Sequence, residues 1–407
     1  MRFLRRCLVI ATVPFALSTP VSSNQIAAPE IIPGRYIVTL KEGITQDSID
    51  LHRSWVSDIL TGSDAIENNI AVPSFNAYFG SFSDAVIDRI KLDSANLQVE
   101  RVEPDQVWRV SATVSQKPAT WGLRSISHRE PGATNYVYDE KGGLGTFAYV
   151  VDTGINYAHV EFEGRAHPGF VAVPGPDIDT YGHGTHVAGT IGSRAYGVAK
   201  KTQLISVKVF LGESSSTSII LLGYAWAIND IVTKKRQAIS AINMSIGGSF
   251  SETFNAVVEA AAALGVTTVV AAGNEGAPAI TTSPASSPHA ITVGAIAPGN
   301  VKASFSNWGA ALDVFAPGVD ILSTYIGSPV AVTTMSGTSM ASPHVCGLAV
   351  YLKSLEFLPD QKSVAARIDA LATRGSVVGE GPGSPNKLTF NGGATLVPVV
   401  PLNATRV

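Results

Sequence analysis

The sequence predicts a three-layer α/β/α domain with a mostly parallel sheet, preceded by a small α+β unit. From residue 121 onward, short apolar segments rich in β-branched residues alternate with longer segments of helical spacing, whereas residues 33–110 mix both patterns over a shorter length. Continuous apolar strands separated by helices are typical of a parallel sheet that helices cover on both faces. With 407 residues, the chain also exceeds the size of one ordinary domain.

The smaller unit is expected to contain three strands and two helices. Strands are predicted at 35–40, 76–82 and 99–110, from β-branched and aromatic content or from alternation. Helical spacing covers 46–60, and Ser83 or Asp84 is a suitable N-cap for a second helix. The small, polar segment 111–120 is predicted to be an exposed linker where a protease could cut.

The larger unit is expected to place its functional residues at one edge of its sheet. In open α/β sheets, ligands bind at the carboxyl ends of the strands. The predicted strands are 147–151, 204–209, 238–245, 266–272, 290–293 and 313–315, and the predicted helices are 184–192, 217–232, 251–264 and 339–355.

Composition excludes several classes of protein. Hydrophobic residues make up 45% of the chain and charged residues 15%, which excludes general disorder. The net charge of −3, from 29 basic and 32 acidic residues, argues against a nucleic-acid partner. Only two cysteines occur, Cys7 and Cys346, so a disulfide scaffold is excluded. We expect Cys346, in an apolar helical pattern, to be a small buried hydrophobic residue.

Residues 1–23 have the order of a secretory signal, so we expect a secreted, extracellular protein. Three arginines precede a short apolar segment, and small residues follow it. A membrane anchor is the alternative, but the apolar segment is too short to cross about 30 Å of hydrocarbon and Pro14 interrupts it. No later segment has the length of a transmembrane helix, so we expect no membrane partner. Of two glycosylation sequons, the one at Asn403 lies in a Pro-containing tail and is favoured, whereas Asn243 lies in a predicted buried strand.

Three motifs place an acid, a histidine and a serine at element boundaries. Asp152 ends a predicted strand just before a glycine turn. His183 lies between glycines at the start of a helix of small residues. Ser339 follows a Gly-containing turn at a helix N-terminus, where free N–H groups and the helix dipole favour negative charge.

These three residue types are those that a nucleophilic serine requires. A hydroxyl attacks a carbonyl only when a histidine removes its proton, and an acid must hold that histidine in the right tautomer. Asn274, after the strand at 266–272, is a candidate donor to the oxyanion, together with the backbone N–H of Ser339. Each motif alone is weak, because DTG also occurs in aspartic proteases and HGTH could be a metal site or a packed histidine. Their joint occurrence favours catalysis.

The chain resembles a subtilase of the proteinase K-like secreted fungal branch. The resemblance runs through the three motifs and through Ser245–Gly248, Ala271–Asn274 and Phe305–Asn307, over nearly all of 121–395. Residues 33–110 resemble an I9-type propeptide, which chaperones and inhibits its enzyme. The resemblance implies a signal peptide at 1–23, a propeptide at 24–113, and a subtilisin-like peptidase domain at 114–407. Autoprocessing of this zymogen is expected near Ser111–Ser115.

Residue roles follow from the resemblance. It implies an Asp152–His183–Ser339 triad that hydrolyses peptide bonds through an acyl-enzyme, with Asn274 as the oxyanion donor, while His186 and His344 are structural. The pocket for the residue before the scissile bond (P1) has uncharged walls, which implies broad specificity with an apolar or aromatic P1 preference. The implied substrate-binding residues are Gly212, Ser214, Ser215, Ser216, Ser245, Ile246, Gly247, Gly248, Ala271, Ala272 and Gly273.

No organic cofactor is expected. The resemblance implies structural calcium, held by the carbonyls of Pro288 and Ala290 and the carboxylate of Asp313, although Asp313 could equally be a solvated acid at a strand end. The expected partners are protein or peptide substrates and the chain's own propeptide, and we expect a monomer.

Two other functions agree less well with these residues. A non-catalytic relative that binds peptides has no need of Asp152, His183, Ser339 and Asn274 together. An α/β-hydrolase esterase would require a GxSxG turn, but the segment Gly337–Ala341 lacks the second glycine and the order of the three residues differs.

Overall fold

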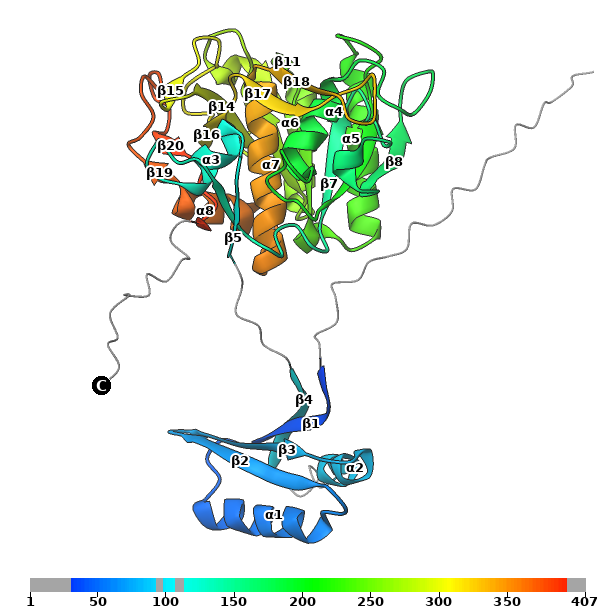
Figure 1. Cartoon of the computed structure of the whole chain (residues 1–407), viewed down its shortest axis with the longest axis vertical. Helices are drawn as coiled ribbons and strands as arrows, with labels where there is room; N and C mark the ends of the chain where they lie inside the picture. Colours follow the sequence, from blue (N-terminus) through cyan, green and yellow to red (C-terminus); the bar gives the residue numbers. More distant parts are fainter. Residues whose placement is uncertain (1–30, 93–97, 107–112, 394–407) are drawn as a thin grey trace, which may run out of the picture. The chain divides into compact units, whose positions relative to one another are not determined.

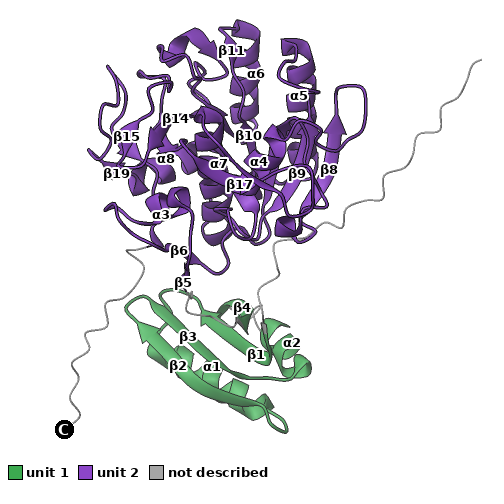
Figure 2. Cartoon of the chain, turned by 45° about the horizontal axis from the view of Figure 1, so that its top comes forward, with its two compact units in different colours: residues 1–108 green, residues 109–407 purple. Residues whose placement is uncertain are grey.

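The computed structural model describes residues 31–92, 98–106 and 113–393, and the chain divides into two compact units, 1–108 and 109–407 (Figures 1 and 2). The predicted signal peptide with Cys7, and the sequon at Asn403, lie outside the described residues. Within those ranges, no helix has both the length and the apolar character needed to cross a membrane.

The first unit is a four-stranded antiparallel sheet in the order β2-β3-β1-β4, covered by two helices. Apolar residues of α1 and α2 pack into one cluster with strand residues such as Val38, Leu40 and Tyr78. This is the predicted α+β unit. Its elements are β1 (Ile31–Leu40), α1 (Gln46–Ile59), β2 (Ala65–Val72), β3 (Phe75–Ser81), α2 (Asp84–Leu92) and β4 (Val99–Gln106).

The second unit contains a ten-stranded sheet in which most neighbours are parallel. The strand order is β19-β20-β16-β14-β12-β10-β7-β9-β8, with β15 paired to β14. Only the β19–β20 and β14–β15 pairs are antiparallel. The strands are β7 (Phe147–Asp152), β8 (Ala166–Val171), β9 (Gln203–Lys208), β10 (Ser240–Met244), β12 (Thr267–Ala271), β14 (Ile291–Ala297), β15 (Val301–Lys302), β16 (Val314–Pro317), β19 (Thr373–Arg374) and β20 (Lys387–Leu388).

Helices cover both faces of this sheet, which confirms the predicted three layers (Figure 1). Successive residues of a strand face opposite sides. Accordingly, Ala148 and Val150 of β7 pack with α4 and α7, whereas Tyr149 and Val151 pack with α5 and α6. The larger helices are α4 (His183–Gly192), α5 (Thr217–Thr233), α6 (Glu252–Ala263), α7 (Thr338–Leu355) and α8 (Gln361–Leu371).

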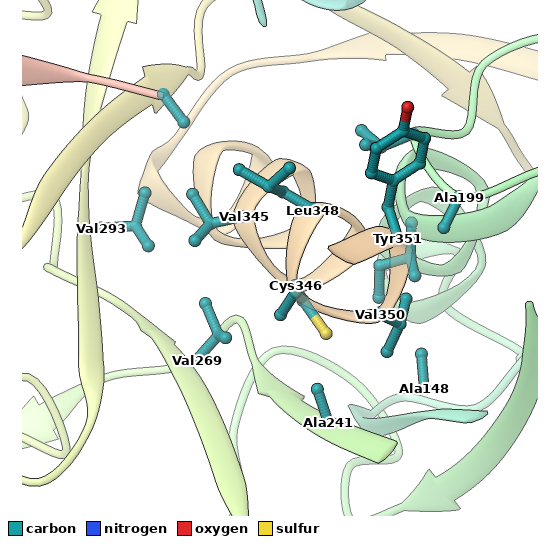
Figure 3. Close-up of a cluster of buried hydrophobic side chains, with 14 of the residues drawn as sticks. Ala148, Ala199, Ala241, Val269, Val293, Val345, Cys346, Leu348, Val350 and Tyr351 are labelled. Carbon is teal, nitrogen blue, oxygen red and sulfur yellow. The ribbon is translucent and has the colours of Figure 1, made fainter. Parts of the chain in front are cut away.

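The core around α7 contains Cys346. The thiol is fully buried and unpaired, and it lies among apolar residues of α7 and of neighbouring strands such as Ala241 and Val269 (Figure 3). Burial raises the pKa of the thiol far above its ordinary value. The sequence-based expectation of a buried hydrophobic role is therefore met.

Some elements differ from the prediction. The linker predicted at 111–120 is wrong for Thr113–Gln116, because these residues form strand β5, which pairs antiparallel with β6 (Tyr136–Asp139). Helix α3 (Trp121–Ser127) and the 3-10 turns at Val160–Phe162, Gln237–Ile239 and Ala279–Thr281 were not predicted. The same holds for two strand pairs, β11 (Gly248–Ser249) with β13 (Thr282–Ser283) and β17 (Ile321–Thr324) with β18 (Val332–Met335). Helix α8 and the strands β2, β6, β8, β15, β19 and β20 were also not predicted.

Candidate active site

The three predicted triad residues lie at the carboxyl edge of the sheet and at the starts of two neighbouring helices. Asp152 is the last residue of β7, His183 the first of α4, and Ser339 the second of α7. Helices α4 and α7 pack against each other on the same face of the sheet. Residues far apart in the sequence are thus brought to one edge, as predicted for this class of fold.

Asp152 and His183 form a close pair. Nδ1 of His183 lies 2.8 Å from Oδ1 and 2.9 Å from Oδ2 of Asp152, whose side chain is only 1% exposed. Burial alone lowers the pKa of His183, but the charge and hydrogen bond of Asp152, with a further contribution from Asp179, raise it above its ordinary value. The carboxylate therefore fixes the ring and favours the imidazolium.

The Ser339 hydroxyl is oriented differently. It donates to the backbone carbonyl of Ser245 over 3.0 Å. Among the described residues, no hydrogen bond joins this hydroxyl to His183, so of the predicted triad only the Asp152–His183 contact is formed. Catalytic hydrogen bonds are often long or poorly aligned in free enzymes and tighten when substrate binds. A rotation about the Cα–Cβ bond of Ser339 is the change that would redirect its hydroxyl.

Ser245 contacts residue 339 a second time, and Pro343 explains why. In a regular helix, the carbonyl of Ser339 would accept from the N–H of residue 343, but proline has none. The Ser245 hydroxyl donates to this carbonyl instead, over 2.7 Å. Asn243 Nδ2 donates to the same hydroxyl oxygen, and Ser342 lies 2.8 Å from it, within a fully buried polar group.

Asn274 is held so that its amide nitrogen is available. Its Oδ1 accepts from both the N–H and the hydroxyl of Thr338, over 2.8 and 2.9 Å. The Thr338 hydroxyl oxygen in turn accepts from the N–H of Gly273. Nδ2 has no hydrogen-bond partner within the described parts of the chain. The side chain is therefore fixed through its oxygen, and its N–H groups can serve a ligand.

The predicted walls of the P1 pocket follow two neighbouring parallel strands. Segment 245–248 comes after β10, and segment 271–273 begins with the last residue of β12, so both lie at the edge that carries Asp152. Ser245, Ala271 and Ala272 are buried, whereas Gly247 and Gly248 are exposed. The Asn307 side chain donates to the Ala272 carbonyl and supports this wall from behind.

The predicted substrate strand, Gly212–Ser216, forms no strand of its own. The Ser215 hydroxyl donates to the carbonyl of Val209, and Ser216 caps α5 by accepting from Ile219 N–H. These bonds fix the end of the segment, and Gly212 and Ser214 lie in its exposed or half-buried part.

His186 and His344 are buried and lie apart from the acid–base pair. Nε2 of His186 lies 2.9 Å from the Ile321 carbonyl, and Nδ1 of His344 lies 2.9 Å from the Met340 carbonyl. Burial lowers the pKa of each to about 4. Both rings are thus neutral near pH 7, which agrees with the structural role predicted for them.

The predicted calcium ligands line one hollow of about 700 Å³. Asp313 is accessible from this hollow yet closely surrounded by protein, and this desolvation raises its pKa to about 6. One carboxylate oxygen accepts from Thr292 N–H over 2.7 Å. Within the described ranges, no cluster of three or more acidic, His or Cys side chains suits a metal. The predicted ligands therefore supply one carboxylate beside the backbone of Pro288 and Ala290, only part of the six to eight oxygen ligands that calcium takes.

Sequence reasoning missed the polar residues that hold the site together. Thr153, Thr185 and Thr338 each lie within two residues of a predicted triad residue, and all three are buried and hydrogen-bonded. Asp179 accepts from two of them. The signal was present, since a threonine stands in each of DTG, HGT and GTS.

Comparison with known proteins places this chain among the subtilisin-like serine endopeptidases. Residues 143–371 match the model of the Subtilase family, and residues 35–111 match that of Peptidase inhibitor I9. The chain therefore belongs to the subtilase family, and an I9 propeptide domain precedes its peptidase domain.

Relatives of similar length are known. The chain is 51% identical to Alkaline protease 1 of Aspergillus clavatus, covering 97% of this chain and 100% of that protein. It is 50% identical to an alkaline proteinase of Hapsidospora chrysogena, covering 95% and 98%. A crystal structure of a cold adapted subtilisin-like serine proteinase matches with a TM-score of 0.63 at 38% identity, covering 68% of this chain and 99% of that one.

The contact between Ser245 and Ser339 gives a first prediction. Ser245→Ala removes the only donor described for the Ser339 carbonyl, and an unpaired buried polar group costs about 1–3 kcal/mol. We expect a lower melting temperature for the purified protein, measured by calorimetry. In a Pro343→Ala background, where residue 343 regains its N–H, the same change should cost less. An equal loss in both backgrounds would contradict the explanation.

Proposed function

We propose that this chain is a secreted zymogen of a broad-specificity endopeptidase that cleaves peptide bonds through an acyl-enzyme on Ser339. The observation that carries the proposal is the buried Asp152–His183 pair at the sheet edge, with Ser339 at the start of the adjacent helix. A buried carboxylate bonded to Nδ1 leaves Nε2 of the imidazole free to accept a proton.

The reaction begins when the Ser339 hydroxyl turns from the Ser245 carbonyl toward His183. His183 takes the proton as Oγ attacks the peptide carbonyl, and Asp152 stabilises the imidazolium that forms. His183 then protonates the leaving amine. Water hydrolyses the resulting ester by the reverse sequence of proton transfers, with His183 again acting as base.

The negative oxygen of the tetrahedral intermediate would be stabilised by Nδ2 of Asn274 and by the backbone N–H of Ser339. The two bonds from Thr338 to the Asn274 oxygen support this role, because they orient the amide before substrate arrives. The N-terminal end of α7 adds the positive end of its helix dipole.

Substrate would bind in extended form along Gly212–Ser216, in the manner of β-strand addition, since this segment pairs with no strand in the described part of the chain. The P1 side chain would enter between 245–248 and 271–273. These walls consist of small or apolar residues, which supports a preference for apolar or aromatic P1 residues.

Three further parts of the proposal concern maturation, location and metal. The I9 domain would be removed by autoprocessing near 111–115, and residues 1–23 would direct secretion. Calcium would be held by Asp313 and the carbonyls of Pro288 and Ala290, and it would stabilise the fold without taking part in the chemistry.

Ser339→Ala tests the proposed reaction. The variant has no nucleophile, so we expect a folded, uncut zymogen, detected by mass spectrometry of the secreted protein. Wild-type mature enzyme should gain one phosphonyl group from a phosphonyl fluoride, located on Ser339 by peptide mapping. A mature wild type that gains no adduct, or a Ser339→Ala protein that matures normally on its own, would favour a non-catalytic peptide-binding protein or an external processing enzyme.

Asn274→Leu tests the oxyanion donor. Loss of one such donor typically lowers kcat by about 10²–10³-fold, while KM changes little because the bond forms mainly in the transition state. Steady-state kinetics on a peptide amide measures both. Asn135→Leu, at a half-buried amide that bonds Ser115, is the matched control and should leave kcat intact. A normal kcat for Asn274→Leu would exclude this residue from the reaction.

Asp313→Ala tests the calcium site. A ligand that binds only the folded state stabilises it by about 2.7 kcal/mol at 100 times its Kd. The melting temperature of the mature wild type should therefore be higher in calcium than in a chelator. This difference should be smaller in Asp313→Ala, whereas the control variant Glu140→Ala should keep it. A difference of the same size in Asp313→Ala would place the ion elsewhere.

A further inference from the structure

Asp179 is a buried carboxylate that none of the triad chemistry above uses. It lies four residues before His183 and is 5% exposed. Its two oxygens accept five hydrogen bonds from the chain. Because a buried carboxylate is costly unless it is fully paired, this degree of pairing indicates a specific role.

The five bonds join the two segments that carry the acid and the base. Oδ1 accepts from the Thr153 hydroxyl over 2.9 Å, and from the N–H groups of Tyr181 and Gly182 over 2.9 and 2.8 Å. Oδ2 accepts from the N–H and the hydroxyl of Thr185, over 2.9 and 2.6 Å. Thr153 follows Asp152 directly, and Thr185 lies two residues after His183.

Thr153 closes this connection. Its hydroxyl oxygen also accepts from the N–H of Gly184, over 2.9 Å, so the residue after Asp152 is bonded to the residue after His183. A displacement of the first turn of α4 relative to the end of β7 would break these bonds. The network thus sets the separation across which Asp152 and His183 meet.

Charged groups face His183 from several elements. Asp152 lies on β7 and Asp179 on the preceding loop, and both raise the pKa of His183 against the lowering effect of burial. His186, on the same helix, is neutral near pH 7. Lys208 on β9 donates to the carbonyls of Thr153 and Ile178, the residues directly after Asp152 and directly before Asp179.

We propose that Asp179 is a positioning residue for the peptidase reaction, which holds the Asp152 turn against the start of α4 and stabilises the His183 imidazolium by its charge. This inference rests on the proposed function. An amide cannot replace the carboxylate, because both oxygens of Asp179 accept from backbone N–H groups. In asparagine, an NH2 group would take the place of one oxygen, and it would face the N–H groups there donor to donor.

Asp179→Asn is the test, with kinetics normalised to active sites titrated by a phosphonyl fluoride. Loss of positioning should lower kcat, by as much as about 10²-fold. Loss of the negative charge should move the acidic limb of the kcat/KM–pH profile to lower pH, since the imidazolium is less stable. Asp139→Asn is the matched control, because Asp139 is another buried aspartate that accepts a backbone N–H, on β6.

A second pair of variants covers the case in which Asp179→Asn fails to fold. Thr153→Ala removes the bridging hydroxyl but keeps the Asp179 charge, so it should lower kcat. Thr153→Ser supplies a hydroxyl again and should restore kcat. If Asp179 had only a structural role, its loss would reduce the number of active sites that the phosphonyl fluoride labels. The kcat per active site and the acidic limb of the kcat/KM–pH profile would then be unchanged. The inference would be overturned if Asp179→Asn kept both the wild-type kcat per site and the wild-type acidic limb, or if Thr153→Ala kept the wild-type kcat per site. If instead the wild type neither cleaves peptides nor labels at Ser339, the proposed function itself fails.

Discussion

The close packing of α4 is the constraint on which the rest of the site depends. A Cβ atom at Gly184 would lie 2.3 Å from the Gly154 carbonyl oxygen, and one at Gly189 would lie 2.2 Å from the Thr324 hydroxyl. Neither position has space for a side chain, so the helix can approach β7 and β17 as closely as its backbone allows. Only at this separation can an imidazole on the first residue of the helix reach a carboxylate on the last residue of the strand.

Around this contact, side chains supply the hydrogen-bond partners that some backbone groups lack. Pro343 deprives the Ser339 carbonyl of its helical donor, and the Ser245 hydroxyl replaces it. The amide oxygen of Asn274 receives both donors of Thr338. Buried polar networks that are fully satisfied rigidify a site, whereas partly satisfied ones are costly. Ser339 and Asn274 are thus held by different neighbours, and each can be perturbed separately.

Much of the larger unit could be predicted because its strands are buried on both faces and appear as continuous apolar segments, as at 147–151. Strand β2 was missed because it is an edge strand with mostly exposed residues, so no alternation marks it. Strand β5 was missed because its residues are small and polar, and only its pairing with β6 makes it a strand. In both, tertiary context overrides local propensity.

In the candidate site, too, some features could be predicted from the sequence and others depend on tertiary context. Motifs at element ends predicted where Asp152, His183 and Ser339 would lie, because the carboxyl ends of parallel strands share an edge. The sequence could not predict that the Ser339 hydroxyl bonds to Ser245, nor that Asp179 collects five donors, because such bonds depend on side-chain geometry between distant segments. The threonines beside each motif became meaningful only when their partners were known.

The enclosure of Cys346 has an experimental consequence. Its sulfur lies within α7, the helix that begins beside Ser339, and apolar neighbours surround it (Figure 3). An alkylating reagent can reach the sulfur only when this helix separates from the sheet. The rate of alkylation therefore reports how often the interior beneath Ser339 opens, without any engineered probe.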